Sequence, residues 1–192
     1  MAVIAAYLLG SLSPGWFLAR TTAGVDLRTT GSGATGATNA ARVLGKKGYA
    51  GVLFLDALKG FIAVWGTYRL LPDHPWAALT SPAVVAGHVW PIWLRFKGGR
   101  GAGPVMGAFI GLDWRIVAWA WGPGLLALLI FRKGFAARAA AFLTSLGFGW
   151  WYLGHADYHP TFFGRPAQIC LLLSWLLVLL AHRGHFAKQV AG

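Results

Sequence analysis

The feature that most constrains this chain is a succession of long apolar stretches. Windows of about 17–25 mainly apolar residues are typical of helices that cross a bilayer. Seven stretches stand out: Ala2–Ala19, Tyr49–Leu71, Trp76–Leu94, Gly101–Leu112, Ile116–Phe131, Ala139–Gly154 and Pro166–Ala181. With 57% hydrophobic and 11% charged residues and a mean hydropathy of +0.58, the composition excludes an ordinary soluble globule. The sequence predicts one all-α integral membrane domain over residues 1–192, with seven transmembrane helices, the fourth short enough to need tilting or extension.

The net charge and the single cysteine limit the kinds of partner and cross-link that the chain can have. A formal net charge of +12 could indicate nucleic acid, but no soluble domain is left over to form a polar groove with exposed aromatic residues. Basic loops against anionic membrane lipids are the better explanation, so we expect no nucleic acid partner. The single Cys170 lies within an apolar run, which excludes a disulfide framework. Met1–Arg20 lacks the basic start of a signal peptide, so we interpret it as the first span.

The basic residues are distributed unevenly between the two sets of loops. The larger set holds Arg20, Arg28, Arg42, Lys46, Lys47, Arg95, Lys97, Arg100, Arg132, Lys133, Arg138, Arg183 and Lys188, whereas the other holds Arg69, Arg115 and Arg165. Lys59 lies within a span and is left aside. Because basic loops stay in the cytoplasm, this asymmetry predicts the N-terminus outside and the C-terminus inside. Two glycine-rich stretches, at about residues 28–48 and 96–104, then face the cytoplasm.

The first glycine-rich stretch includes TGSGATGATNAARVLGKKG, from Thr30 to Gly48. Glycines permit positive φ and let successive backbone N–H groups converge on an anion. The candidate phosphate-binding groups are the glycines and polar side chains at Gly31, Ser32, Gly33, Gly36, Thr35, Thr38 and Asn39. A helix starting at Asn39–Leu44 would present its N-terminus to phosphate, and Arg42 would add a forked contact. A flexible linker with surface lysines is the alternative that this stretch alone leaves open.

The second glycine-rich stretch is FKGGRGAGP, from Phe96 to Pro104. It has the ingredients of a phosphate-binding loop without the P-loop spacing. Its candidate residues are Lys97, Gly98, Gly99, Arg100 and Gly101. A basic cytoplasmic loop would explain the cations but not the glycines. Two glycine-and-cation stretches on one face therefore predict a phosphate site.

Several polar residues are predicted at membrane depth, where each needs a partner or a function. Asp56 and Lys59 lie three residues apart and can pair on one helix, which favours a structural ion pair over catalysis. His88 either lines the site or bonds a neighbouring helix. His182 and His185, which leave the last span on the same side, are either interfacial anchors or site residues.

The absence of some chemistry is informative. The chain contains no glutamate, and only Asp26 and Asp56 among its aspartates fall on the predicted cytoplasmic side. The histidines lack zinc-site spacing, and neither a His-x-x-x-x-Asp motif nor a G-x-S-x-G elbow occurs. We therefore expect no metal and no cofactor. Any chemistry must rest on phosphate binding, orientation and charge neutralisation.

These residues resemble the signatures of a known family. VDLR at Val25–Arg28 followed by GSGATGATNAARVLGKKG is similar to the first motif of the bacterial acyl-phosphate:glycerol-3-phosphate acyltransferases (PlsY). GHVWPIWLRFKGGRG at Gly87–Gly101 resembles the second motif, and AHRGH at Ala181–His185 the third. The resemblance covers nearly the whole chain, because LDALKGF, LLGSLSPG and the seven-span layout also match.

The resemblance implies transfer of a fatty acyl group from acyl phosphate to the 1-hydroxyl of glycerol 3-phosphate, in the bacterial inner membrane. The products would be 1-acylglycerol 3-phosphate and phosphate, for phospholipid synthesis. It assigns the important serine and arginine to Ser32 and Arg42, the phosphate loop to Lys97–Gly101 and the third-motif histidine to His182. It also implies that the substrate's own phosphate assists deprotonation, so that no side-chain base is needed.

The chain departs from the family pattern at four places. Ala34 stands where asparagine is usual, Arg100 replaces a lysine, and His185 stands at an asparagine position. A serine-rich turn reads GFAARAA here, where Arg138 is the candidate to replace the lost hydroxyls. Two questions stay open. The chain could be a non-catalytic relative that binds or moves a phosphorylated lipid or a polyol phosphate, and Ser32 could be an acylated nucleophile instead of a hydrogen-bond donor.

Overall fold

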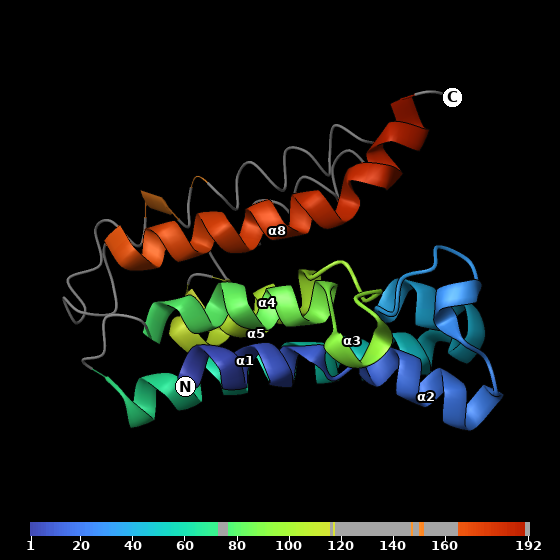
Figure 1. Cartoon of the computed structure of the whole chain (residues 1–192), viewed down its shortest axis with the longest axis horizontal. Helices are drawn as coiled ribbons and strands as arrows, with labels where there is room; N and C mark the ends of the chain where they lie inside the picture. Colours follow the sequence, from blue (N-terminus) through green and yellow to red (C-terminus); the bar gives the residue numbers. More distant parts are fainter. Residues whose placement is uncertain (73–76, 116, 118–146, 148–149, 152–164, 191–192) are drawn as a thin grey trace.

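The computed structural model describes residues 1–72, 77–115, 117, 147, 150–151 and 165–190, and the described part of the chain is helical with no strand. Its elements are α1 Ala2–Ser11, α2 Pro14–Ala23, η1 Leu27–Thr29, α3 Ala37–Leu70, η2 Ala77–Leu79, α4 Thr80–Val89, η3 Ile92–Leu94, α5 Ala102–Leu112 and α8 Arg165–Val190. The expected fifth and sixth spans, Ile116–Phe131 and Ala139–Gly154, lie almost wholly outside the described residues. Figure 1 shows the axes of α1, α4, α5 and α8 lying roughly parallel, with the chain returning along α5 from the end that α4 reaches.

Three of the described helical segments are long and apolar enough to cross a membrane. They are Ala2–Ala23, Ala37–Leu70 and Ala77–Leu94. Two shorter apolar helices, Ala102–Leu112 and Leu172–His182, correspond to the expected fourth and seventh spans. The sequence therefore located the apolar segments of the described part of the chain correctly.

The first span differs from the expected continuous Ala2–Ala19. Two helices, α1 and α2, are separated at Leu12 and Ser13, and Pro14 begins α2. Proline lacks an N–H group and disfavours helical backbone in the residue before it, so the first helix ends here. The break leaves the Leu12 carbonyl free of helix bonding, and the ammonium of Lys59 donates to it at 2.7 Å.

The first glycine-rich stretch is a loop only as far as Gly36. Helix α3 begins at Ala37, two residues before the expected start, and continues through the second span to Leu70. Gly45 interrupts the helical backbone with φ 67° and ψ −163°, a conformation that glycine adopts readily. We call Thr30–Gly36 the first glycine loop and Arg95–Gly101 the second glycine loop.

Glycines set the distance between the packed helices. Gly103, Gly107 and Gly111 of α5 face the backbone or side chains of α3, and a Cβ at Gly107 would collide with the Ala57 carbonyl. Gly10 and Gly87 allow the same close approach between α1 and α4. Such small-residue contacts are typical of helix packing in membranes, where lipid removes the hydrophobic driving force for association.

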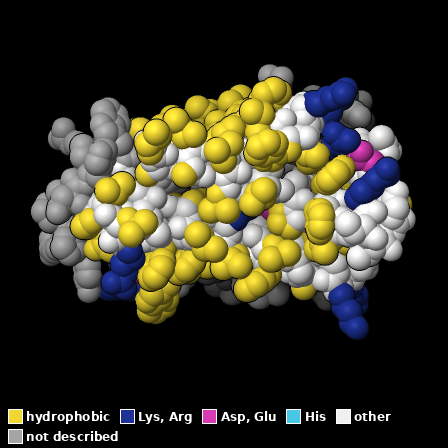
Figure 2. All heavy atoms as spheres, turned by 60° about the horizontal axis from the view of Figure 1, so that its bottom comes forward, with side chains coloured by type: hydrophobic (Ala, Val, Ile, Leu, Met, Phe, Trp, Pro, Cys, Tyr) yellow, Lys and Arg dark blue, Asp and Glu magenta, His cyan; other side chains and the backbone are white. Residues whose placement is uncertain are grey.

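The main core lies between α1, α3, α4, α5 and the described part of α8. Phe109, Val84, Val85 and Val105 are at most 1% exposed, and the Phe109 and Trp175 rings lie 6.5 Å apart between centroids. Conversely, large apolar side chains face outward along several helices, among them Ile4, Phe54, Ile62, Leu172 and Leu176. Figure 2 shows this apolar band, with lysine and arginine side chains near the ends of the molecule. An outward apolar band of this kind fits a lipid environment.

Both glycine loops gather at one end of the helices, beside α2 (Figure 1). The amide of Thr35 donates to the Gly98 carbonyl at 3.2 Å, which joins the two loops directly. A cluster of Trp16, Asp26 and Arg28 supports them from α2 and η1. Asp26 accepts from Trp16 at 3.1 Å and pairs with Arg28 at 2.6 Å, and Arg28 lies over the Trp16 ring.

Candidate active site

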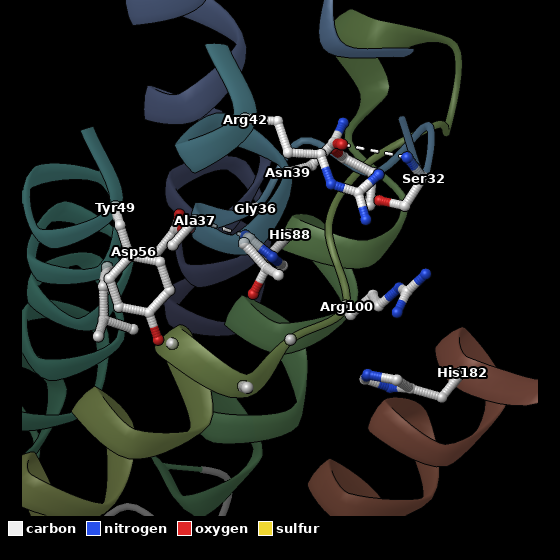
Figure 3. A pocket seen from close by; sticks show the side chains of 16 residues that line it. Ser32, Gly36, Ala37, Asn39, Arg42, Tyr49, Asp56, His88, Arg100 and His182 are labelled. Carbon is white, nitrogen blue, oxygen red and sulfur yellow. Dashed lines mark hydrogen bonds and ion pairs between the residues drawn. The ribbon is translucent and has the colours of Figure 1, made fainter. Parts of the chain in front are cut away.

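A cavity of about 330 Å³ opens where the two glycine loops meet the helix ends. Its walls combine segments that are far apart in the sequence (Figure 3). The lining residues are Ser32, Ala34, Gly36, Ala37, Thr38, Asn39, Arg42, Tyr49, Leu53, Asp56, His88, Arg100, Gly101, Ala102, Gly103 and His182. The predicted site residues Ser32, Thr38, Asn39, Arg42, His88, Arg100, Gly101 and His182 are thus brought together.

Two helix N-termini meet at this cavity. Gly36 caps α3 and Gly101 caps α5, and the residues that follow each cap line the cavity. The first N–H groups of a helix have no partner within the helix, and the helix dipole gives this end partial positive charge. Gly101 has φ 87°, which a residue with a side chain rarely adopts. The arrangement is suited to binding anions.

Two arginines reinforce this preference. Arg42 comes from α3 and Arg100 from the second glycine loop, and the His182 imidazole lies across from them on α8 (Figure 3). Burial, and after it the nearby Arg42, lowers the pKa of Arg100 below its ordinary value. Asp56 is the one carboxylate among the lining residues, and Lys59 pairs with it at 2.9 Å. The cavity is therefore short of negative charge.

A single side chain, Asn39, organises the first glycine loop. It is 2% exposed, and its Nδ2 lies 2.9–3.0 Å from the carbonyl oxygens of Leu27, Thr30 and Ala34. Its Oδ1 accepts from the amide of Ser32 at 3.1 Å. These contacts fix the backbone at Ser32, so that the serine contributes to the cavity wall from a rigid loop.

Gly31 is needed for the same arrangement. Its φ is 59°, and a Cβ there would collide with Oδ1 of Asn39 and the guanidinium of Arg42. Gly31 and Gly33 do not themselves line the cavity. They allow the turn that brings the lining side chains into position.

The second glycine loop is held by its backbone. The amide of Gly98 donates to the Val89 carbonyl at 3.1 Å, and that of Gly99 to the His88 carbonyl at 2.9 Å. These two amides therefore tie the loop to the end of α4, whereas the cavity wall begins at Arg100. Lys97 is exposed and does not line the cavity.

Two non-glycine residues of this loop have left-handed backbone, Arg95 with φ 54° and Phe96 with φ 60°. Consecutive left-handed residues with side chains are costly, and such strain often occurs at functional sites. No pattern in the sequence indicates this strain. Sequence reasoning also missed the lining role of Tyr49, Leu53 and Asp56, because their neighbours are apolar and only the folded helix turns them toward the loops.

The predicted site histidines make different contacts. Nδ1 of His182 lies 2.8 Å from the Val178 carbonyl, which can only accept, so Nδ1 carries the proton. His185 lies in α8, but its side chain is outside the described residues, as is the whole of Arg138. His88 both lines the cavity and bonds a neighbouring helix, since its Nδ1 lies 2.9 Å from Nζ of Lys59.

Among the described residues, no cluster of three or more histidine, cysteine, aspartate or glutamate side chains could hold a metal ion. The residues that line the described cavity offer hydroxyls, guanidinium groups, imidazoles and the backbone amides of two helix N-termini.

Comparison with known proteins agrees with this anion-binding architecture. The family described as glycerol-3-phosphate acyltransferase matches residues 1–192. This chain belongs to the glycerol-3-phosphate acyltransferase family. Among its relatives of that name, the protein from Gloeobacter violaceus is 36% identical over 195 residues, covering 98% of this chain and 89% of the relative. That from Prochlorococcus marinus (strain NATL2A) is 31% identical, covering 97% and 91%.

Two solved structures of this acyltransferase family are similar over the whole chain. Both are of PlsY, described as an integral membrane glycerol 3-phosphate acyltransferase. The glycerol 3-phosphate form has a TM-score of 0.84 at 31% identity, and the lysophosphatidic acid form 0.80 at 30%. Each comparison covers 100% of this chain and 91% of the other. With the apolar helices, these relatives show that the chain is an all-helical integral membrane protein.

Proposed function

We propose that this chain transfers a fatty acyl group from an acyl phosphate to the 1-hydroxyl of glycerol 3-phosphate, in the cavity between the two glycine loops. The hydroxyl oxygen attacks the acyl carbonyl carbon, and the bond from that carbon to the phosphate oxygen breaks. The hydroxyl proton passes to a phosphate of the substrates. The products are 1-acylglycerol 3-phosphate and inorganic phosphate.

One observation carries the proposal: two helix N-termini and two arginines face one cavity in a member of this family. Both substrates carry a phosphate group, so a productive complex holds two anions close together. Arg42 and Arg100 neutralise them, and the N-termini of α3 and α5 supply backbone donors. The cavity has no unpaired carboxylate among its described residues that would oppose this binding.

Ser32 fits a hydrogen-bond donor better than a nucleophile. A nucleophilic serine needs an adjacent base that a third group orients. Among the described residues, no hydrogen bond joins the Ser32 hydroxyl to the imidazole of His88 or His182, whose bonded Nδ1 atoms contact Lys59 and the Val178 carbonyl instead. We assign Ser32 to a phosphate or to the developing oxyanion, and His182 to the same polar wall of the cavity. Thr38 and the amides after Gly36 complete the donor set.

The acyl chain leaves the cavity on its apolar side. Tyr49 and Leu53 line the cavity on α3, and Tyr49 and Phe54 are 42% and 65% exposed on the outer surface of that helix. A fatty chain that passes Tyr49 enters the apolar band directly. This route lets the donor phosphate reach the polar end while its chain stays in lipid.

The test is release of inorganic phosphate by the purified protein, with acyl phosphate and glycerol 3-phosphate supplied together or singly. We expect release that depends on both, with 1-acylglycerol 3-phosphate identified by mass spectrometry. Binding of glycerol 3-phosphate without turnover would instead support a non-catalytic or transport-type relative. Intact-mass measurement with acyl phosphate alone should find no acyl adduct, and a stoichiometric adduct on Ser32 would overturn direct transfer.

We further propose seven membrane spans in the bacterial inner membrane, with the N-terminus outside and the cavity facing the cytoplasm. Support comes from the uneven basic residues and from the position of both glycine loops at one end of the helices. In a Cys170→Ser background, Lys97→Cys should react only with a membrane-permeant reagent. Leu70→Cys, 80% exposed at the end of α3, should react from outside. The reverse pattern in sealed cells would overturn the orientation.

A further inference from the structure

A buried cluster of titratable side chains adjoins the cavity, and the anion binding proposed above gives it no role. Asp56 and Lys59 of α3 and His88 of α4 are each 3–4% exposed. Asp56 and His88 line the cavity, whereas Lys59 lies behind them. Charged groups buried this deeply within apolar helices are costly, and their presence calls for a specific role.

The contacts of Lys59 decide the arrangement of the cluster. Its Nζ lies 2.7 Å from the Leu12 carbonyl, 2.9 Å from Oδ1 of Asp56 and 2.9 Å from Nδ1 of His88. An ammonium group has protons and no lone pair, so the Leu12 carbonyl and Nδ1 of His88 both accept hydrogen bonds from it, while Oδ1 of Asp56 forms an ion pair with it. Nδ1 of His88 therefore has no proton of its own.

The proton of the neutral His88 imidazole then lies on Nε2. The competing arrangement, in which Nδ1–H donates to Asp56, would turn a proton of His88 toward the ammonium of Lys59. The distances agree, because Nδ1 lies 3.3 Å from Oδ1 of Asp56 but 2.9 Å from Nζ of Lys59. Nδ1 faces the ion pair, and the other edge of the ring faces the second glycine loop.

The Nε2 atom lies against Gly99. A Cβ added at Gly99 would collide with Nε2 before any other atom. No hydrogen bond of Nε2 occurs within the described residues, and His88 lines the cavity beside Arg100 (Figure 3). An N–H group here would add to the donors that face an anion, whereas a bare lone pair would repel it.

We propose that Lys59 and Asp56 are positioning residues that hold His88 in the Nε2–H tautomer, so that Nε2 donates a hydrogen bond to an anionic oxygen bound in the cavity. Lys59 sets the tautomer by donating to Nδ1. Asp56 balances the charge of Lys59. The Leu12 carbonyl, left free by the break between α1 and α2, accepts a further hydrogen bond from Lys59. This inference rests on the proposed function, because it assigns an anion to the cavity.

The tautomer itself is measured on protein without substrate. Selective ¹⁵N labelling of the histidines distinguishes protonated from bare ring nitrogens, and the spectrum of His88→Gln assigns the His88 signals by difference. We expect a proton on Nε2 and none on Nδ1, and a shift of the Nε2 signal on titration with inorganic phosphate. A proton on Nδ1 in the unsubstituted chain would overturn the inference.

Variants separate tautomer control from a structural ion pair. Lys59→Met removes the donor to Nδ1, so the proton should move to Nδ1 and face Asp56. The KM for glycerol 3-phosphate and the inhibition constant of inorganic phosphate should rise about 10- to 100-fold, the effect of losing a hydrogen bond to a charged group. In the double variant Asp56→Asn, Lys59→Met, the amide introduced at position 56 can donate to Nδ1. It should restore the Nε2 proton and most of the affinity.

Substitutions at His88 provide the conservative comparison. His88→Gln keeps an N–H donor at about the reach of Nε2 and should retain more affinity than His88→Asn, whose amide is shorter. Equal losses in these two variants, or an unchanged tautomer and KM in folded Lys59→Met protein, would overturn the inference. If the protein shows no acyl transfer at all, the proposed function fails. If His88 carries its proton on Nδ1 while turnover is normal, the proposed function stands and the positioning role of Lys59 and Asp56 is wrong.

Discussion

The two glycine loops reach the same cavity by opposite means. The first is held by one buried side chain, Asn39, which bonds four backbone groups of the loop region. The second is held by backbone bonds to the end of α4, from the amides of Gly98 and Gly99. The first loop therefore depends on the side chain of Asn39, whereas the second depends on glycines, which have no side chain to keep the loop away from α4.

This difference explains where the glycines are essential. In the first loop Gly31 and Gly33 both have positive φ, so the requirement is conformational at both, and Gly31 also lacks room for a Cβ. In the second loop Gly98 and Gly99 lie directly against α4, where a Cβ would collide with the His88 carbonyl or with the His88 ring. There the requirement is space. Arg42, from the helix that follows the first loop, and Arg100, from the second loop, both line the cavity.

The largest effect is expected from removing these arginines. Arg42→Ala or Arg100→Ala leaves a partly desolvated anion without its partner, a loss of about 2–5 kcal/mol. We therefore expect turnover to fall by orders of magnitude in protein that remains folded. Arg100→Lys, which keeps the charge, is the matched control and should retain substantial activity. Near-normal turnover in folded Arg42→Ala protein would remove Arg42 from the site.

Breaking the first loop at its side chain should have the next largest effect. Asn39→Asp keeps an oxygen for the Ser32 amide but places a second oxygen against three carbonyls. The lost bonds and the repulsion should destabilise the protein by about 3 kcal/mol. Thermal unfolding in detergent measures this loss. Asn39→Ala should be milder, and greater stability of the aspartate variant than of the alanine variant would contradict the hydrogen-bond assignment.

These loops also show what the sequence could predict. Apolar length located the described spans, and the glycine-and-cation pattern located the face of the cavity, because both depend on local composition. The pattern did not distinguish cavity-lining groups from supporting ones. Asn39 was expected to bind phosphate, and the structure uses its amide to hold the loop while one edge lines the cavity. Binding by the side chain itself stays a prediction.

Other features depend on tertiary contacts that no local pattern contains. Lys97 shares the glycine-rich stretch with Arg100, yet only Arg100 lines the cavity, because the turn at Arg95 and Phe96 directs the loop. The ion pair of Asp56 and Lys59 was predicted from spacing along one helix and is present at 2.9 Å. Its contact with His88 required the packing of α3 against α4.

Alanine substitutions at two glycines should have a smaller effect, and they separate the need for space from the need for positive φ. An alanine at position 99 can adopt the backbone conformation of Gly99, but its Cβ would collide with the His88 ring. Overpacking of this kind destabilises a protein by about 1–3 kcal/mol. Gly33→Ala has room, its nearest atom being the Arg28 carbonyl at 3.4 Å, but its φ of 71° strains an alanine. We expect Gly99→Ala to reduce turnover and Gly33→Ala mainly to reduce stability. Equal effects on turnover would contradict the distinction.

The smallest effect concerns Asp26, which supports both loops from outside the cavity. The Arg28 guanidinium, which donates to the carboxylate, is the main cause that lowers the pKa of Asp26 from 3.8 to about 2. Since the folded pKa lies below the unfolded one, the pair stabilises the protein above about pH 4 and stops doing so as pH falls toward 2. The contribution should stay below about 1 kcal/mol, because the carboxylate is partly exposed.

The Asp26 contribution is measured as a difference, because other carboxylates also titrate. Thermal unfolding of the unsubstituted chain and of Asp26→Asn is compared at about pH 6 and about pH 3. The variant should be less stable at the higher pH, and the gap should narrow at the lower pH as the Asp26 carboxylate takes up its proton. A gap that widens on acidification would show that Arg28 does not stabilise the ionised form.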